Sequence, residues 1–562
     1  MPVVDVRISD IERLLGKSVD VEELRTLVES LKCEVERLDD DILEYEATHD
    51  RPDLFSAEGL ARALQGLMEI EIGLRRFRFK DYTVEVQVGN VYYRPYIACA
   101  IVKNLRLDDE GVRQIMQLQE KLHMTYCRNR RRASIGVYDL DTIKPPIKYL
   151  LVPKDEIKFV PLECAESMRG DEILKRHPKG IEYGHIIAEY DEYPLLIDSE
   201  GTVLSMPPII NSEDTKVTPK TKNMFIDVTG TDLRTVMQML TIMVCNIAER
   251  GAPEVIEGTI VVAPTWSYRC PDLKTETLKL NVDYVNDIIG LSLKQDDVAK
   301  YLMMMRHDVE KEFEGTLRVS IAPYRIDILH EIDLVEDVAM AYGYDKLEPE
   351  LPIWHYTIGK EDPIERFTRL MRETLVGIGF TEVANYMLTN VDIIARRMRI
   401  EGMKLVELEN PISERFTVVR TWIIPQLLEI ASLNKVMGYP LKLFEAGDVV
   451  IPDESLENRA RSERHLAAII ASPDITVVDA LVVLNAVARG LGLRFTYRNA
   501  EHPSFIEGRF GLIMCRNEQV GIVGEVHPEV LENFELDVPV AAFELNLNRL
   551  HGHYLRRVEE LL

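Results

Sequence analysis

The sequence predicts a multidomain α+β protein, and three observations carry this prediction. The chain has 562 residues, more than one hydrophobic core organises, so roughly three to five domains are expected. A helix–helix–strand module occurs twice at a constant offset of 274 residues. The C-terminal third alternates short apolar strands with a few helices, which favours an antiparallel sheet with helices on one side.

Composition excludes several classes of protein. The net charge of −27 opposes general nucleic-acid binding, because phosphate contacts need Lys and Arg. None of the seven cysteines forms a Cys-x-x-Cys pair, so neither a zinc site nor a disulfide framework is predicted. No apolar run reaches about 18 residues, and the N-terminus is charged from its start. We therefore expect a cytoplasmic protein without a membrane segment.

The repeat is seen when residues 11–36 are placed over residues 285–310. Each copy contains a short apolar helix that ends at glycine, a second helix and a strand-like segment. The same offset places "DRPDLFSAEGLARAL" on "YRIDILHEIDLVEDV", so that an Arg-x-Asp motif recurs. We assign residues 1–84 to the first copy and residues 270–346 to the second.

The second copy carries acids that the first copy lacks. Asp333, Glu336 and Asp337 have the spacing i, i+3, i+4 and are expected on one helix face, with Asp327 just upstream. Such an oxygen-rich cluster suits a hard cation such as Mg²⁺. The alternative is structural, because Asp333 and Glu336 also fit a capping box and acids in a first turn favour the helix dipole.

Residues 85–265 are predicted to form a mixed α/β domain. Several polar side chains follow its strands and are candidates for one small pocket. They are Ser205, Asn211, Asp214, Asp227, Thr229 and Thr231. The alternative, which the pattern alone favours, is that they cap helices and close turns.

Two basic stretches interrupt the acidic chain, at 75–80 ("RRFRFK") and 128–132 ("RNRRR"). The first interleaves cations with aromatics, as surfaces that bind nucleic acid often do. A basic edge strand and a solvated loop are the favoured interpretations. Residues 350–562 contain no Walker loop, dinucleotide fingerprint or nucleophile elbow.

Several blocks in order carry a resemblance over essentially the full chain. They include "HDRPDLFSAEGLARAL", "ASIGVYDLDTIKPPIKY", "MPPIINSEDTKVT", "YRIDILHEIDLVEDVAMAYGYDKLEPELP" and "HPSFIEGRFGLIMC". Together they resemble the β subunits of phenylalanine–tRNA ligase in their archaeal and eukaryotic form.

The resemblance implies roles for each region. Asp327, Asp333, Glu336 and Asp337 fall on the family's Mg²⁺-binding positions. The repeated modules resemble winged-helix-like scaffolding domains. The central domain resembles an editing domain that hydrolyses tyrosine wrongly attached to tRNA-Phe. Its implied pocket positions are Ser205, Asp227 and Thr229.

The C-terminal region resembles a class II synthetase core that has lost its chemistry. No Glu follows Arg415 or Arg420 as the second class II motif requires, and Phe495 interrupts the Gly-x-Gly-x-x-Arg motif. Phenylalanine activation with ATP is therefore expected on a separate α subunit, in a heterotetramer of two α and two β chains that acts on tRNA-Phe. The alternatives are a non-hydrolytic scaffold and tRNA-binding subunit of the same complex, or a free-standing aminoacyl-tRNA hydrolase.

Overall fold

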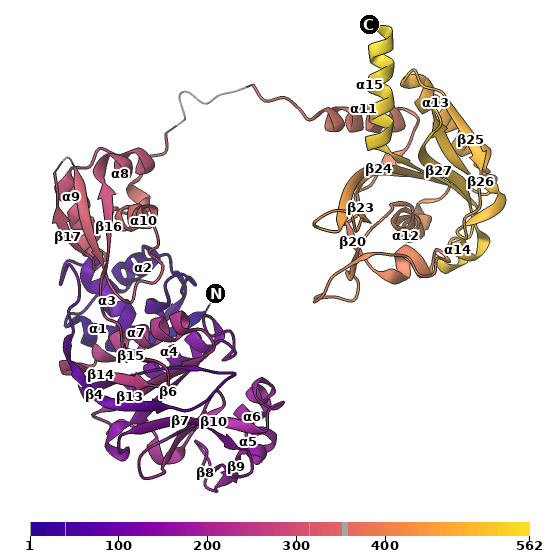
Figure 1. Cartoon of the computed structure of the whole chain (residues 1–562). Coiled ribbons are helices and arrows are strands. Elements are labelled where there is room, and N and C mark those ends of the chain that lie inside the picture. Colours follow the sequence, from indigo (N-terminus) through magenta and orange to yellow (C-terminus); the bar gives the residue numbers. More distant parts are fainter. Residues whose placement is uncertain (1, 40, 314, 351–357) are drawn as a thin grey trace. The chain divides into compact units, whose positions relative to one another are not determined.

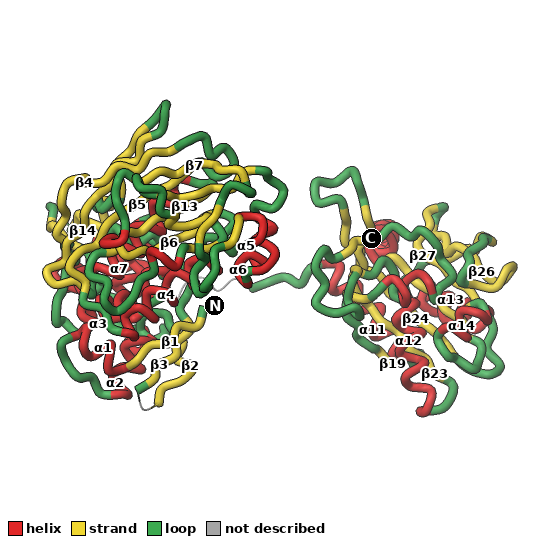
Figure 2. Tube along the Cα trace, turned by 90° about the horizontal axis from the view of Figure 1, so that it is seen from below, coloured by secondary structure: helices red, strands yellow, loops and turns green. Residues whose placement is uncertain are grey.

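The computed structural model describes residues 2–39, 41–313, 315–350 and 358–562. The chain forms two compact units, residues 1–351 and residues 352–562 (Figures 1 and 2). The first unit contains both repeat copies and a large sheet between them in the sequence. No helix in the described residues is long and apolar enough to cross a membrane.

The two repeat copies have the same order of elements and the same sheet topology. In the first copy the elements are β1 (Val3–Arg7), α1 (Ile8–Leu15), α2 (Val21–Glu29), β2 (Glu34–Asp39), β3 (Ile42–Glu46) and α3 (Ala57–Leu67). In the second copy they are β16 (Glu276–Asn281), α8 (Val282–Ile289), α9 (Gln295–Met304), β17 (Asp308–Lys311), β18 (Thr316–Ile321) and α10 (Glu331–Tyr342). The antiparallel sheets run β1-β3-β2 and β16-β18-β17, so each copy has its last strand in the middle.

Backbone details also recur at the offset of 274. Gly16 and Gly290 end α1 and α8 with φ of 71° and 78°, a left-handed conformation that favours glycine. Lys32 and Arg306, which are equivalent positions, both have positive φ, of 64° and 69°. The two copies therefore follow the same backbone path.

The central region builds a ten-stranded sheet. Its strands are β4 (Arg78–Val88), β5 (Tyr96–Leu105), β6 (Ala133–Asp139), β7 (Ile147–Pro153), β10 (Glu192–Ile197), β11 (Val203–Met206), β12 (Ile210–Asn211), β13 (Met224–Gly230), β14 (Gly251–Val262) and β15 (Ser267–Cys270). The order is β12-β11-β10-β7-β4-β14-β5-β13-β6, and β15 also pairs with β14.

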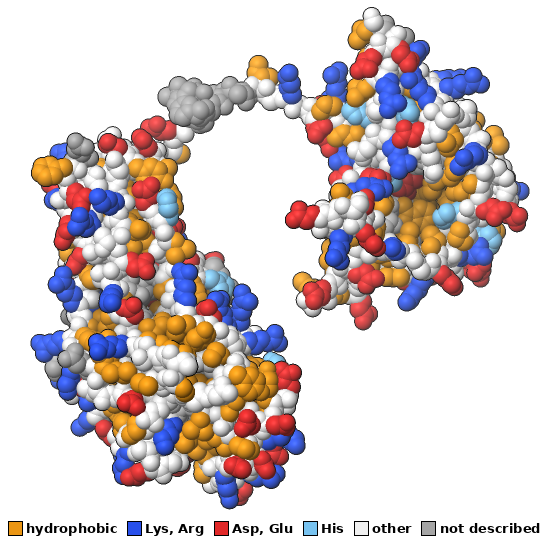
Figure 3. All heavy atoms as spheres, viewed as in Figure 1, with side chains coloured by type: hydrophobic (Ala, Val, Ile, Leu, Met, Phe, Trp, Pro, Cys, Tyr) orange, Lys and Arg blue, Asp and Glu red, His pale blue; other side chains and the backbone are white. Residues whose placement is uncertain are grey.

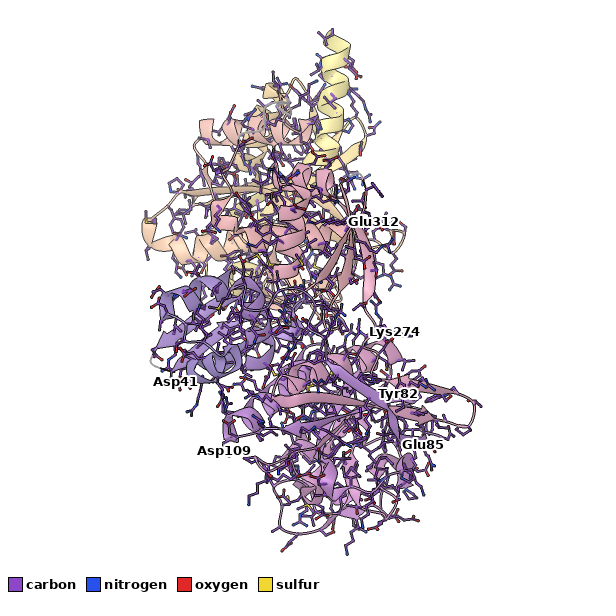
Figure 4. The ribbon with its side chains drawn as sticks, turned by 90° about the vertical axis from the view of Figure 1, so that its left-hand side faces the viewer. Asp41, Tyr82, Glu85, Asp109, Lys274 and Glu312 are labelled. Carbon is purple, nitrogen blue, oxygen red and sulfur yellow. The ribbon has the colours of Figure 1, made fainter. Side chains whose placement is uncertain are left out.

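Helices α4 (Asp109–Met124) and α7 (Leu233–Ala248) cover the end of this sheet that contains β5, β13 and β6. Helix α7 is buried along most of its length, because α3 of the first copy packs against it as well. A side lobe contains β8 (Lys158–Phe159), β9 (Met168–Arg169), α5 (Gly170–Arg176) and α6 (Pro178–Tyr183). In Figure 4, Tyr82 and Glu85 mark β4, and Asp109 marks the beginning of α4.

The expected domain boundary between residues 84 and 85 lies inside β4, which joins the central sheet from Arg78 onward. Residues 78–80 of the basic stretch pair with β14, whereas β7 pairs with β4 only at residues 86–88. Along the basic stretch, the described part of β4 therefore has a strand partner on one side. Three of the four cations of this stretch are paired with acids. Arg75 pairs with Glu249, Arg76 with Asp308 and Lys80 with Glu257. These pairs neutralise most of the stretch, and Arg78 carries its fourth positive charge.

The second unit is a seven-stranded sheet with helices. Its principal elements are α11 (Pro363–Gly377), β19 (Thr381–Glu382), α12 (Ile424–Asn434), β23 (Leu441–Pro452), β24 (Ala460–Ala471), α13 (Val477–Gly490), β25 (Phe495–Asn499), β26 (Phe505–Cys515), β27 (Glu518–Val526), α14 (Pro528–Asn533), β28 (Val540–Asn546) and α15 (Leu547–Leu561). A small sheet contains β20 (Leu388–Thr389), β21 (Val406–Glu407) and β22 (Val418–Val419). The large sheet runs β19-β23-β24-β28-β27-β26-β25 and is antiparallel except for the β19–β23 pair.

Helices cover both faces of this sheet, which corrects the prediction of helices on one side. Along β24, Leu466, Ala468 and Ile470 join one core with α11, α13 and α15, whereas Ala467 and Ile469 join a second core with α12. The uninterrupted apolar run "HLAAIIA" is typical of a strand that is buried on both faces.

The two repeat copies meet at their Arg-x-Asp motifs. Arg51 donates to both oxygens of Asp53 at 2.9 Å. Its equivalent Arg325 binds Asp327 at 2.7 Å and both oxygens of Asp337 at 2.9 Å. Burial and repulsion from Arg325 act against the charge on Arg51, but Asp53 and Asp327 hold the pKa of Arg51 above its ordinary value. The two motifs therefore form one buried charge network.

Replacing Arg325 by Ala should destabilise the first unit strongly, because it leaves the buried Asp337 without its cation. Such a loss typically costs about 3–5 kcal/mol. The matched control is Arg318→Ala, which breaks an exposed pair with Glu312 (labelled in Figure 4) and should cost about 0–1 kcal/mol. Urea unfolding of the two variants measures the difference, and equal losses would contradict the assigned role.

Candidate functional site

A cavity of about 350 Å³ lies at the β6–β13 end of the large sheet. Its walls come from α4, β6, the segment from β11 to β12, and β13. The polar residues that line it include Gln119, Glu120, Tyr138, Ser205, Asn211 and Asp227. This volume is at the lower end of the range for ligand sites and suits a group of amino-acid size.

Strand register creates the space for this cavity. Asp227 on β13 pairs across the ladder with Gly136 on β6. A Cβ at position 136 would lie 2.1 Å from the Tyr138 hydroxyl and 2.3 Å from Oδ1 of Asp227. Glycine is therefore needed here, because any side chain would displace both polar groups.

Three buried polar groups form the deepest part of the cavity wall. The Tyr138 hydroxyl donates to Oδ1 of Asp227 at 2.5 Å and contacts Oγ of Ser205 at 2.8 Å. Asp227 is 1% exposed, and burial raises its pKa to about 7, although the hydrogen bond from Tyr138 and the charge of Arg94 oppose the shift. The carboxyl group is thus poised between its two protonation states near neutral pH.

Thr229 lies two residues further along β13 but does not line the cavity. Its hydroxyl accepts from Nε of Arg94 at 3.0 Å and contacts Ser134 at 3.0 Å. Arg94 is fully buried and also donates to the carbonyl of Thr229 at 2.7 Å. Thr229 thus supports the strand that carries Asp227, and neither Asp214 nor Thr231 reaches the cavity.

Sequence reasoning missed several polar residues of this site, including Tyr138, Glu120 and Arg130. Arg130 turns inward, binds Glu120 at 2.7 Å and donates to the carbonyl of Ile209 at 2.9 Å. No local pattern distinguishes it from its exposed neighbours in "RNRRR", because only contacts with distant segments bury it. For Tyr138, the alternation of β6 gave a weak signal.

The acidic helix α10 divides its carboxylates between two environments. Asp337 is fully buried, where it binds Arg325 and Nε2 of His307 at 2.7 Å. Burial opposes its charge, but Arg325 and His307 hold the pKa of Asp337 below the ordinary value. Asp337 therefore points into the core, which corrects the expectation that it shares one helix face with Asp333 and Glu336.

The other three predicted ligands lie closer to the surface. Asp333 caps α10 by accepting from the amides of Leu329 and His330, both at 2.8 Å. Glu336, whose side chain is 41% exposed, pairs with Lys32 of the first copy at 3.0 Å. Asp333 and Glu336 thus keep their carboxylates near the surface, whereas Asp327 and Asp337 are bound by Arg325.

Within the described residues, one group of acids has ligand atoms within 4.8 Å of one another, namely Glu34, Glu36 and Glu46 on β2 and β3. The four predicted ligands do not form such a group in that part of the chain. The three glutamates lie on the surface of the first module, and exposed acidic groups are common without an ion.

In the second unit, Arg420, one of the two arginines considered for the second class II motif, has a structural role. Arg420 is 1% exposed and binds Glu445 at 2.7 Å and Gln426 at 3.0 Å. Phe495 is a buried core residue on β25. Arg420 and Phe495 thus offer no free guanidinium to a nucleotide, whereas Arg415, the other arginine considered, is exposed.

Three family models match consecutive parts of the chain. They are the B3/4 domain over residues 106–243, the tRNA synthetase B5 domain over residues 278–344, and the phenylalanyl-tRNA synthetase β-chain CLM domain over residues 347–547. The phenylalanine–tRNA ligase β subunit of Thermofilum pendens is 45% identical, over 99% of this chain and 100% of its own length. The chain belongs to the family of phenylalanine–tRNA ligase β subunits.

Further relatives of the phenylalanine–tRNA ligase β family agree. The β subunit of Pyrococcus horikoshii is 43% identical over 98% of this chain and 100% of its own length. A crystal structure of an N-terminal fragment of that subunit is 44% identical, has a TM-score of 0.59 and covers 61% of this chain and 100% of the fragment. The matched B3/4 region contains the cavity, and the matched B5 region contains the acidic helix α10.

Replacing Asp227 by Asn should change how stability depends on pH. The folded-state pKa of Asp227, about 7, lies above its ordinary value of 3.8, so the folded chain keeps a proton that the unfolded chain has lost. The wild type should therefore lose stability as pH rises from about 4 to about 7, whereas the Asn variant lacks this loss.

Thermal unfolding of both proteins at pH 5 and pH 8 tests this, and the Asn variant should gain relative to the wild type at pH 8. Ser205→Ala alters the same network without removing a titrating group and serves as the control. A wild-type to Asn difference that is the same at both pH values would contradict the assigned protonation.

Proposed function

We propose that this chain supports the ATP-dependent attachment of phenylalanine to tRNA-Phe by an α subunit and hydrolyses tyrosine wrongly attached to that tRNA. The synthetic reaction converts phenylalanine, ATP and tRNA-Phe into Phe-tRNA-Phe, AMP and pyrophosphate. The observation that supports the hydrolytic part is the cavity with the buried Asp227–Tyr138–Ser205 network at its wall.

The polar wall gives a physical basis for choosing tyrosine. A pocket built for phenylalanine rejects an added hydroxyl only modestly, so a second site that requires the hydroxyl improves accuracy. A tyrosyl phenol can form a hydrogen bond with Asp227 or Ser205, whereas a phenylalanyl ring offers these groups no partner besides Tyr138. A hydrogen bond of this kind typically contributes about 0.5–1.5 kcal/mol, and more where one group is charged. The cavity should therefore discriminate against the correct product.

Replacing Asp227 by Ala should relax this discrimination. Without the carboxylate the wall no longer favours a phenol over an apolar ring, so hydrolysis of Phe-tRNA-Phe should rise relative to that of Tyr-tRNA-Phe. The ratio of the two rates should fall about tenfold, the equivalent of roughly 1.4 kcal/mol. Thr221→Ala is the matched control, because it removes a buried hydroxyl near the other end of β13.

Phenylalanine-dependent ATP–pyrophosphate exchange in the αβ complex should stay at the wild-type level in both variants. If the wild-type complex hydrolyses Tyr-tRNA-Phe no faster than the uncatalysed reaction, the chain is a non-hydrolytic scaffold. If an active complex keeps both rates in Asp227→Ala, the carboxyl group does not discriminate between the two substrates. If the chain alone hydrolyses Tyr-tRNA-Phe at the full rate, it is a free-standing hydrolase.

A separate α subunit is proposed as the site of phenylalanine activation, in a heterotetramer of two α and two β chains. The burial of Arg420, and a Phe at position 495 where the third class II motif needs an Arg, support this proposal. Large apolar side chains of this unit are exposed, including Tyr386, Ile412, Leu433, Val436 and Met437. Hydrophobic side chains gather on its drawn face (Figure 3), and patches of this kind mark contact surfaces.

We also propose that the acidic end of α10 holds Mg²⁺. Asp333 and Glu336 carry the accessible oxygens, while Asp327 and Asp337 would become ligands only by releasing Arg325. A bound Mg²⁺ would supply positive charge that ties carboxylates of this surface together. Lys32, which pairs with Glu336 at 3.0 Å, would release this carboxylate when the ion binds.

The double change Asp333→Asn with Glu336→Gln should abolish bound Mg²⁺ in the purified αβ complex, because it removes both accessible carboxylates. Metal analysis after dialysis against Mg²⁺ measures this. The control is Glu34→Gln with Glu36→Gln, which removes two acids from the other cluster and should leave the metal content unchanged. Metal lost from the control alone would place the ion on β2 and β3 instead.

A further inference from the structure

The basic loop between α4 and β6 has an unusual backbone. Arg128, Asn129 and Arg130 are three consecutive non-glycine residues with positive φ, of 50°, 51° and 63°. Each such residue costs about 1–2 kcal/mol relative to the right-handed conformation. A conformation of this cost persists only where surrounding contacts hold it, and such positions cluster at functional sites.

Hydrogen bonds to the protein interior hold this backbone conformation. The amide of Asn129 donates to the carbonyl of His123 at 2.8 Å, and the amide of Arg132 donates to that of Cys127 at 2.9 Å. The buried Arg94 donates to the carbonyls of Arg130 and Arg131 at 3.2 and 3.4 Å. The loop backbone is thus held by the protein core. The side chain of Arg130 turns inward, whereas those of Arg128 and Arg131 are exposed.

Two of its arginines are exposed and unneutralised. The side chains of Arg128 and Arg131 form no hydrogen bond or ion pair within the described residues of the chain. Arg132 is 40% exposed and pairs with Asp232 at 2.9 Å. In the basic stretch 75–80, by contrast, three of the four cations pair with acids. In a chain with a net charge of −27, the loop thus places two free guanidinium groups close together on a backbone that the core holds.

The loop forms one wall of an open hollow of about 820 Å³. The hollow is lined by Arg128, Arg131, Arg132, Tyr183, His185 and Thr231. One acid, Glu182, also lines it, but Glu182 pairs with Lys179 at 3.1 Å. The lining is therefore predominantly basic.

The hollow and the cavity share two walls. Within the loop, Arg130 lines the cavity while its neighbours line the hollow. Within the segment 177–185, His177 and Lys179 line the cavity while Tyr183 and His185 line the hollow. A chain lying in the hollow would thus pass next to the cavity.

We propose that this hollow binds the backbone phosphates of the unpaired 3′ end of an RNA, through Arg128 and Arg131 with Arg132 at the side. This proposal rests on the proposed hydrolytic function, because an aminoacyl group in the cavity must be joined to a 3′-terminal nucleotide outside it. Exposed guanidinium groups bind phosphates as charge-assisted pairs. The loop positions the strand and carries no sequence preference.

The binding test uses the full chain and two RNA hairpins, one with four unpaired 3′ nucleotides and one with a blunt end. The wild type should bind the first hairpin more tightly. Arg128→Ala with Arg131→Ala should weaken that binding roughly tenfold and lower the slope of log affinity against log salt by about 0.7 per lost phosphate contact. The proposal is overturned if this variant keeps the wild-type preference.

Lys220→Ala with Lys222→Ala is the matched control, because it also removes two exposed positive charges, just before the opposite end of β13. It should bind both hairpins as the wild type does. If it loses as much affinity as the arginine variant, the effect is one of general charge and the proposed site is wrong.

A second measurement separates this proposal from the proposed function. In hydrolysis of Tyr-tRNA-Phe, the arginine variant should raise KM with little change in kcat, because the loop binds the strand and does not touch the reacting ester. If the wild type hydrolyses no Tyr-tRNA-Phe, the proposed function fails, and the hairpin measurement alone decides whether the hollow binds RNA. An unchanged KM in the arginine variant, when the wild type is active, would overturn the proposal.

Discussion

The first unit depends on a buried network of charges where the two repeat copies meet. Arg51 with Asp53 and Arg325 with Asp327 are equivalent pairs, and Arg325 also binds Asp337. Buried ion pairs add little net stability compared with apolar contacts, but they are costly to break on one side. The network therefore specifies how the copies join more than it adds to the free energy of folding.

The repeat also shows that equivalent helices of the two copies, α3 and α10, have different roles. In the first copy, Arg62 on α3 is buried and binds Asn246 of α7 at 2.8 Å, which attaches the copy to the central sheet. The equivalent residue in the second copy is Glu336 on α10, which lies at the surface beside Lys32. A position used for packing in one copy is thus free to carry acid in the other.

In the central sheet, the position of β13 decides the chemistry of the cavity. Its pairing with β6 places Asp227 opposite Gly136, and the missing side chain leaves room for the Tyr138 hydroxyl. Two residues later, the Thr229 hydroxyl forms hydrogen bonds with Ser134 and the buried Arg94. Arg94 also donates hydrogen bonds to two backbone carbonyls of the basic loop. One buried guanidinium therefore joins the strand that carries Asp227 to the loop beside the cavity.

The sequence by itself determined the repeat at 274 residues, the positions of the acids and the absence of nucleotide-binding motifs, because these depend on spacing and residue type. The apolar run in β24 was also visible, but only the structure showed that helices cover both sides of it. Tertiary structure decided that Asp337 points inward, that Thr229 lies outside the cavity and that Tyr138 and Arg130 line it. The physical reason is that helical and strand periodicity describe one element at a time. Burial of a carboxylate or a guanidinium depends on partners that are distant in the chain.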